Sequence, residues 1–378
     1  MPMRPHILVV LSLISFLAAG CTHTLPPHQE VNQALHKTLN SSGYNYSSKS
    51  RITNLTVPVK DLKAATSKQQ YMEKGLEAVR GLSIIADGAI DMKAKKSEVL
   101  YNLHYDQDNL EVSIKVPLLL DYTNQTLYIG TTLFNTIFPM PPASKGKLIK
   151  VDLNDLLKLT GDKSDKLKNM LGQKNFDAVN EGFKQGILKG FTNLKDERFI
   201  DQPLTGDDKA VGVVRHIKVT LNHEESVALL LTIADTLIQR LYQDGVLSKE
   251  EYGTLMILTD RQKIDTYLAK FSMAVTLDIG LTSAGQISRI ESRFTAVGKD
   301  NRYQVGLENI SGFSRYDAPL FSIKPELTGT VDYKEILDAY LAAKATAKAE
   351  AAAAAAAAKA KAAEQEEPPK EEEKKIAE

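Results

Sequence analysis

The chain of 378 residues contains one cysteine, Cys21, and no tryptophan. A single cysteine has no partner for a disulfide within the chain, so a fold held together by disulfide bonds is excluded. The chain also lacks an excess of charge of either sign, because Lys and Arg together number 47 and Asp and Glu also number 47. This balance argues against a nucleic-acid partner, since phosphate binding requires a basic surface.

Sequence motifs of catalysis and metal binding are also missing. The chain has no Gly-x-Ser-x-Gly elbow, phosphate-binding loop, His-Glu-x-x-His pair or calcium loop. The nearest candidate, His223 with Glu224, is interpreted as the exposed first turn of a helix whose dipole favours acidic residues. His104 is predicted on the polar face of a strand. We therefore expect no enzyme activity, catalytic residue, metal site or cofactor.

A long apolar run without charges or glycine lies near the N-terminus. Residues 7–17 read "ILVVLSLISFL", after Arg4 and before the small residues 18–20. This run is too short for an ordinary membrane-spanning helix of about 20 residues. Its order of basic, apolar and small residues is typical of a secretory signal peptide, predicted here as residues 1–20.

The end of that segment, "LAAGC", resembles the lipobox of bacterial lipoproteins. The resemblance implies cleavage after Gly20 and acylation of Cys21, which would become the mature N-terminus. The alternative is a cleaved signal followed by an incidental free cysteine. In this class an aspartate after the cysteine implies the inner membrane, so Thr22 implies an anchor in the outer membrane, with the folded part facing the periplasm or, alternatively, the exterior. Residues 21–30 are predicted to be a lipidated tether that spans at most ~30 Å.

Alternating apolar residues predict two blocks of antiparallel strands. Residues 99–117 form a predicted hairpin around the turn "DQDN", and residues 125–134 extend the same sheet. The second block comprises residues 213–221, 271–297 and 302–310, with Gly285 at a turn. Each block needs helices to cover one face, and capping signals at Asn222 and Ser248 predict two of them. The predicted class is α+β, with one domain over residues 31–331 and a helical insertion at about 152–191.

Two groups of strand residues are candidate binding sites. Apolar residues on one face of the first hairpin could line a lipid cavity or simply form the core: Tyr101, Leu103, Tyr105, Val112 and Ile114. A row of alternating charge, Arg289, Glu291 and Arg293, could bind an anionic headgroup or form ion pairs across strands.

The C-terminal region is rich in alanine and lysine. Residues 332–363 predict an extended, projecting helix, followed by a disordered acidic tail at 364–378. A short apolar stripe near its start predicts where the helix docks on the domain: Ile336, Leu337, Tyr340 and Leu341.

The order of these elements resembles the LolA/LolB and LppX/LprG class of envelope lipoproteins. The resemblance rests on the lipobox, a first helix "EVNQALHKTLN", the segments "GKLIKVDLNDLLKL" and "VRHIKVTLNHEE", and the late hairpin "AVTLDIGLTSAGQISRIESRF". It covers about residues 30–333 and implies a strongly curved antiparallel sheet, a half-barrel, wrapped around helices with an apolar cavity for acyl chains.

Two functions are compatible with the sequence. The first is a lipoprotein that is anchored in the outer membrane through Cys21 and binds or carries a lipid or other acylated ligand. The second is a structural or interaction lipoprotein whose C-terminal helix reaches a protein partner in the envelope. The two hypotheses differ in whether the space between sheet and helices is open or filled.

Overall fold

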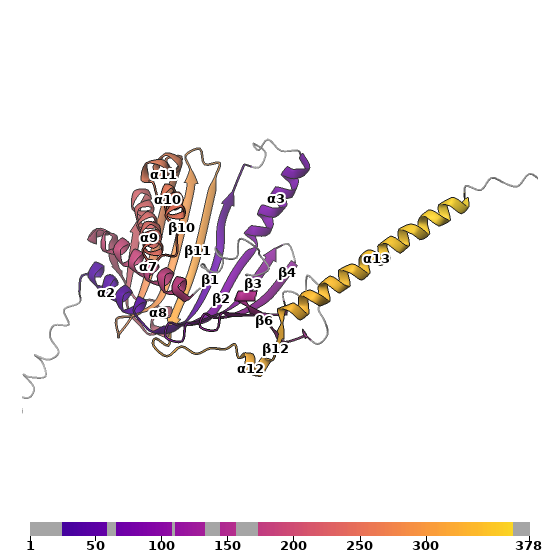
Figure 1. The fold of residues 1–378 in the computed structure, drawn as a ribbon. Helices are drawn as coiled ribbons and strands as arrows, with labels where there is room; N and C mark the ends of the chain where they lie inside the picture. The colour runs from indigo at the N-terminus through magenta and orange to yellow at the C-terminus, as the bar shows by residue number, and fades with distance from the viewer. Residues whose placement is uncertain (1–24, 59–65, 108–109, 133–143, 156–172, 366–378) are drawn as a thin grey trace, which may run out of the picture.

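The computed structural model describes residues 25–58, 66–107, 110–132, 144–155 and 173–365 (Figure 1). Helices pack against one large curved sheet of 12 strands, which is not closed into a barrel. Its strand order is β12-β6-β5-β4-β3-β2-β1-β11-β10-β9-β8-β7. The predicted α+β class is confirmed at this level.

The strands have the following bounds: β1 Gly43–Thr56, β2 Leu82–Asp91, β3 Lys96–Gln107, β4 Leu110–Asp121, β5 Thr126–Gly130, β6 Leu148–Asp152, β7 Phe199–Gln202, β8 Val213–Leu221, β9 Phe271–Thr282, β10 Ile287–Gly298, β11 Gln304–Ser314 and β12 Thr330–Asp332. The helices are α2 Pro27–Leu39, α3 Thr66–Arg80, α7 Gln173–Thr192, α8 Gly206–Ala210, α9 His223–Gln243, α10 Lys249–Leu258, α11 Arg261–Leu268, α12 Pro325–Thr328 and α13 Tyr333–Gln365, with a short 3-10 helix at Asp196–Arg198.

Strand pairing agrees with most of the sequence prediction and corrects one part of it. The β3–β4 hairpin and the β8–β9–β10–β11 meander pair antiparallel, as predicted. However, β12 pairs parallel with β6, so the sheet is mixed rather than antiparallel throughout. The two predicted blocks form one sheet because β1 pairs with β2 on one side and with β11 on the other.

The main hydrophobic core lies on one face of the sheet, which we call the helix face. Helices α2, α7 and α9 cover this face over β7–β10 (Figure 1). Fully buried residues from helix and strands meet there, among them Val31, Val219 and Ile279. The opposite face, on which Arg293 and Glu308 lie, is called the outer face.

Capping boxes begin the two predicted helices. The Asn222 side chain accepts a hydrogen bond from the backbone of Glu225, and the Glu225 carboxylate accepts one from the backbone of Asn222. Ser248 and Glu251 make the same reciprocal pair at α10. Each box satisfies helix N–H groups that have no partner within the helix, which fixes where the helix begins.

The N-terminal boundary differs from the predicted one. Residues 27–30, expected in the tether, are the first turn of α2, because Pro27 stands at a position where a helix needs no N–H donor. Glu30 accepts a hydrogen bond from Arg215 Nη1 at 2.8 Å, and the same nitrogen donates to the Leu25 carbonyl at 2.8 Å. The chain is therefore fixed to the domain from Leu25 onward.

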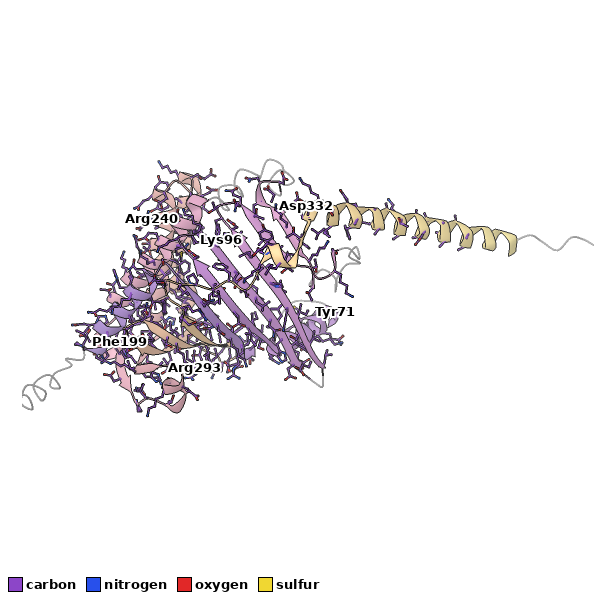
Figure 2. The ribbon with its side chains drawn as sticks, turned by 90° about the horizontal axis from the view of Figure 1, so that it is seen from below. Tyr71, Lys96, Phe199, Arg240, Arg293 and Asp332 are labelled. Carbon is purple, nitrogen blue, oxygen red and sulfur yellow. The ribbon has the colours of Figure 1, made fainter. Side chains whose placement is uncertain are left out.

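The start of α13 packs on a small second core. Tyr333 and Ile336 contact a cluster of Ile149, Val151 and Val331. Of the stripe predicted to dock there, only Ile336 does so, and the prediction is wrong for Leu337, Tyr340 and Leu341, which are exposed. In Figure 2, Asp332 at the start of α13 lies far from Phe199 in the helix-covered core.

Candidate functional site

The helix face continues over β2–β4 as a largely apolar surface that is open in part. The five predicted cavity residues all lie there and pair across the hairpin: Tyr105 with Val112, Leu103 with Ile114, and Tyr101 with Val116. Tyr101 and Val112 are 37% and 38% exposed. This part of the face is therefore less tightly covered than the core over β7–β10.

Strand register extends these pairs into rows that cross the sheet. One row consists of Ser292, Asn309, Ser50, Ile84, Leu103 and Ile114. The next consists of Ile290, Ser311, Ser48, Ala86, Tyr101 and Val116. On the other side of the first row lie Phe294, Leu307, Ile52, Leu82, Tyr105 and Val112. None of the residues in these rows is charged.

A pocket of about 440 Å³ opens on the same face over β2, β1, β11 and β10. Its apolar walls come from Ile52, Leu82, Ile84, Phe294 and Leu307, and its polar residues include Ser50, Ser292 and Asn309. The predicted residues Leu103 and Tyr105 lie beside it, across the β2–β3 pairing. Pocket and predicted residues thus form one continuous surface.

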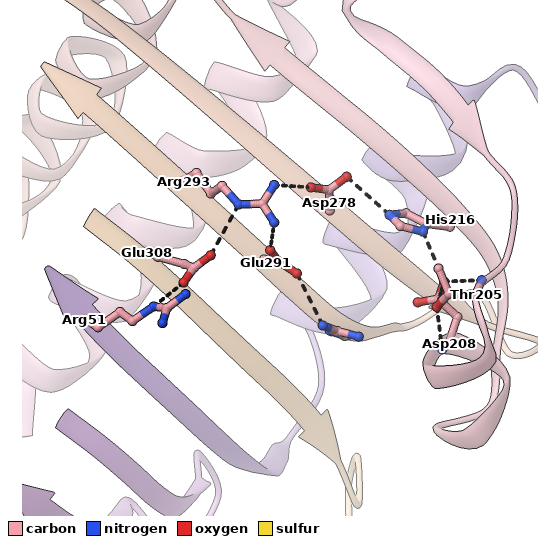
Figure 3. A network of polar contacts seen from close by, with 9 residues as sticks. Arg51, Thr205, Asp208, His216, Asp278, Glu291, Arg293 and Glu308 are labelled. Carbon is pink, nitrogen blue, oxygen red and sulfur yellow. Dashed lines mark hydrogen bonds and ion pairs between the residues drawn. The ribbon is translucent and has the colours of Figure 1, made fainter. Parts of the chain in front are cut away.

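Two charged residues border this pocket without placing charge on the helix face. Arg51 and Glu308 alternate with the helix-face residues of β1 and β11, and their side chains pair with each other on the outer face (Figure 3). The pocket floor is therefore uncharged.

Sequence reasoning missed the contribution of β1 and β2 to this surface. The helix-face positions of β1 include Ser48 and Ser50, so its alternation is not one of apolar with polar residues. The signal that was present is the set of β-branched residues Ile84, Ile85 and Ile90 in β2. Neither strand's sequence identifies its neighbour in the sheet.

The charged row of β10 belongs to a network on the outer face (Figure 3). Arg293 pairs with Glu291, with Glu308 at 3.3 Å and with Asp278 at 3.5 Å, while Arg289 donates to Glu291 at 3.3 Å. The ion-pair interpretation of this row is thus the one that the structure supports. The hydrogen bond from Arg51, together with the one from Arg293, outweighs burial and lowers the pKa of Glu308.

His216 connects the network to α8. Its Nδ1 lies 3.2 Å from Asp208 and its Nε2 lies 3.3 Å from Asp278. Burial raises the pKa of Asp208, but hydrogen bonds from the Thr205 backbone and hydroxyl, with the contribution of His216, leave this pKa below its ordinary value. Because both ring nitrogens of His216 face carboxylates, the arrangement stabilises the fold and offers no unoccupied base.

The remaining histidine candidates lie apart from each other. His104 is on the outer face of β3, 3.9 Å from the exposed Glu111. His223 is the first residue of α9, behind the Asn222 cap. No group of three His, Cys, Asp or Glu side chains among the described residues could hold a metal ion.

Cys21 and Gly20 lie outside the described residues. Within the part of the chain that the structure describes, no helix combines the length and apolar character needed to span a bilayer. No protein-family model matches the chain, and no curated protein matches it.

Proposed function

We propose that this chain is an outer-membrane-anchored lipoprotein that binds or carries an acylated lipid on its helix face, in the periplasm and without catalysing a reaction. The observation that supports the proposal is the uncharged surface that crosses the sheet from β10 to β4 and includes a pocket of about 440 Å³. Six strands at ~4.8 Å spacing give a path of ~24 Å, enough for an extended acyl chain.

The energy of such binding would come from removing methylene groups from water. Each CH₂ transferred to an apolar site contributes ~0.8 kcal/mol. Leu307 of β11 and Val112 of β4, both in the outermost row, are 43% and 38% exposed. A ligand that covered both would also remove their exposed apolar surface from water.

Paired substitutions on β4 test this proposal. The parent protein is the full chain carrying Cys21→Ser, purified without detergent. In it, Val112→Glu should weaken the binding of a fluorescent fatty-acyl probe at least about tenfold, because the substitution places a charge against the acyl chain of the probe. Ser113→Glu adds the same charge one residue away on the outer face and should leave binding unchanged. Equal effects of both variants, or no probe binding and no lipid in native mass spectra of the parent chain, would contradict lipid binding.

A second function is favoured by the position of α13. This helix of 33 residues leaves the body at the β12 edge, whereas α2 lies at the opposite side of the sheet (Figure 1). We infer that a lipidated N-terminus and a projecting arm could join the membrane to a protein partner in the envelope. Removing residues 342–378 distinguishes the two functions, because it should abolish an arm function and leave probe binding intact.

A further inference from the structure

A cluster of neutral polar side chains lies within the apolar surface of the helix face. We call Ser48, Ser50, Ser292, Asn309 and Ser311 the serine–asparagine cluster. Asn309 Nδ2 donates to Ser48 Oγ at 2.6 Å and to Ser50 Oγ at 2.8 Å. Ser311 Oγ donates to Asn309 Oδ1 at 2.7 Å. These bonds hold the cluster in one arrangement.

Hydrogen-bond donors remain in this cluster. Ser50 Oγ accepts from Asn309, which leaves its hydroxyl proton to donate. Ser292 lines the same pocket, and its hydroxyl has no protein partner among the described residues. A ligand that placed a carbonyl or hydroxyl oxygen beside either serine could accept a hydrogen bond from it.

The surroundings of the cluster disfavour an ionised ligand group. The cationic side chains nearest in register, Arg51 and Arg293, lie on the outer face and are paired with Glu308 and Glu291. An ionised carboxylate or phosphate on the helix face would lose hydration without gaining a cation. The pocket therefore favours an uncharged acceptor.

We propose that the helix face binds a neutral acyl ester or amide lipid, whose carbonyl oxygen accepts a hydrogen bond from the Ser50 or the Ser292 hydroxyl and whose acyl chain lies along Ile84, Leu103 and Ile114. This inference rests on the proposed lipid binding and specifies the ligand class. The polar half and the apolar half of one strand row provide the two parts of the site.

Displacement measurements with three competitors test the ligand class. On the full chain carrying Cys21→Ser, a fatty-acid methyl ester, the free fatty acid with the same chain and the corresponding alkane would each displace a fluorescent acyl ester probe at pH 8. We expect the ester to bind about tenfold more tightly than the ionised acid and about fivefold more tightly than the alkane, in line with one or two added hydrogen bonds.

Substitutions in the cluster assign that preference to named residues. Ser50→Ala with Asn309→Leu should remove most of the advantage of the ester over the alkane without weakening alkane binding. Lys49→Ala, on the same strand but on the outer face, is the matched control and should retain the advantage. Ser292→Ala, a single small change, provides the same test if the double variant fails to fold.

The possible outcomes separate the two proposals. If no competitor or probe binds, lipid binding itself is wrong. If all bind but the acid equals or exceeds the ester, or if Ser50→Ala with Asn309→Leu and Ser292→Ala leave the ester advantage intact, the neutral-lipid inference is wrong and the proposed function stands. A concentration-dependent dimer that loses probe binding as it forms would instead identify a second copy as the occupant and overturn the inference.

Discussion

Glu308 shows how single residues of the outer face depend on partners from other strands. Its carboxylate lies between Arg51 of β1 and Arg293 of β10, and its side chain is 12% exposed. The side chains of Arg51 and Arg293 are 59% and 49% exposed, so water screens both interactions. The network therefore contributes modest stability that depends on pH.

Glu308→Gln should lower the free energy of unfolding by about 0.5 kcal/mol at pH 7. The expected loss is small because water screens the interactions with the two exposed arginines. Because the folded-state pKa of Glu308 is lowered, its contribution is complete above the unfolded value of ~4.3 and is lost as pH falls through the folded value. Urea unfolding at several pH values should show the difference from wild type shrinking as pH falls below about 5. Glu111→Gln, at a 74% exposed position, should show almost no difference, whereas a pH-independent loss for Glu308→Gln would contradict this account.

At the scale of elements, the packing of α7 on α9 depends on glycine. The segment holding Gly182, Gly186 and Gly190 has low intrinsic helix propensity, since an internal glycine costs ~1 kcal/mol relative to alanine. In the structure a Cβ at Gly186 would lie 2.9 Å from Ile233 Cα, and one at Gly182 would lie 2.9 Å from Leu237 Cδ1. Glycine thus allows the two helices to approach closely.

Gly186→Ala should destabilise the protein by about 1–2 kcal/mol, because the clash with the Ile233 backbone outweighs the gain in helix propensity. Gly253→Ala in α10 is the matched control, since a Cβ there has no neighbour within 4 Å. It should stabilise by roughly 0.5–1 kcal/mol from propensity alone. Chemical denaturation of both variants measures these changes, and stabilisation by Gly186→Ala would rule out the close-packing role.

At the scale of the whole molecule, β1 unites two halves that the sequence presents separately. Its pairing with β11 joins residues 43–56 to residues 304–314. The uncharged rows of the helix face exist only because of this pairing, since Ser50 and Asn309 come from its two strands. The lipid proposal therefore depends on contacts between distant parts of the chain.

The anchor proposal concerns a different part of the molecule. Cys21→Ser should abolish labelling with palmitate and partition into detergent, because the acylated thiol would be the membrane attachment. The melting temperature of the domain should not change, since α2 begins at Pro27 and the chain is fixed to the fold from Leu25. A Cys21→Ser protein that is labelled and retained like wild type would refute lipidation at this residue.

The elements that were predicted correctly are those that depend on local signals in the sequence. Alternation within residues 99–117 and 271–297 was enough for the hairpins, because the period of two is a property of a single strand. The caps at Asn222 and Ser248 involve only residues three positions apart. The predicted lipobox at Cys21 is also read from adjacent residues, but it lies outside the described part of the chain and stays a prediction.

Only the tertiary structure decided the neighbours of β1, the parallel β12–β6 pair and the limits of the tether. Each depends on contacts between residues far apart in sequence, such as Arg215 with Leu25 and Ser50 with Asn309. A residue pattern reports which face of its own element is apolar, but it does not name the element that packs there. The continuous helix face, with its neutral polar cluster, arises from the pairing of β1 with β2 and β11.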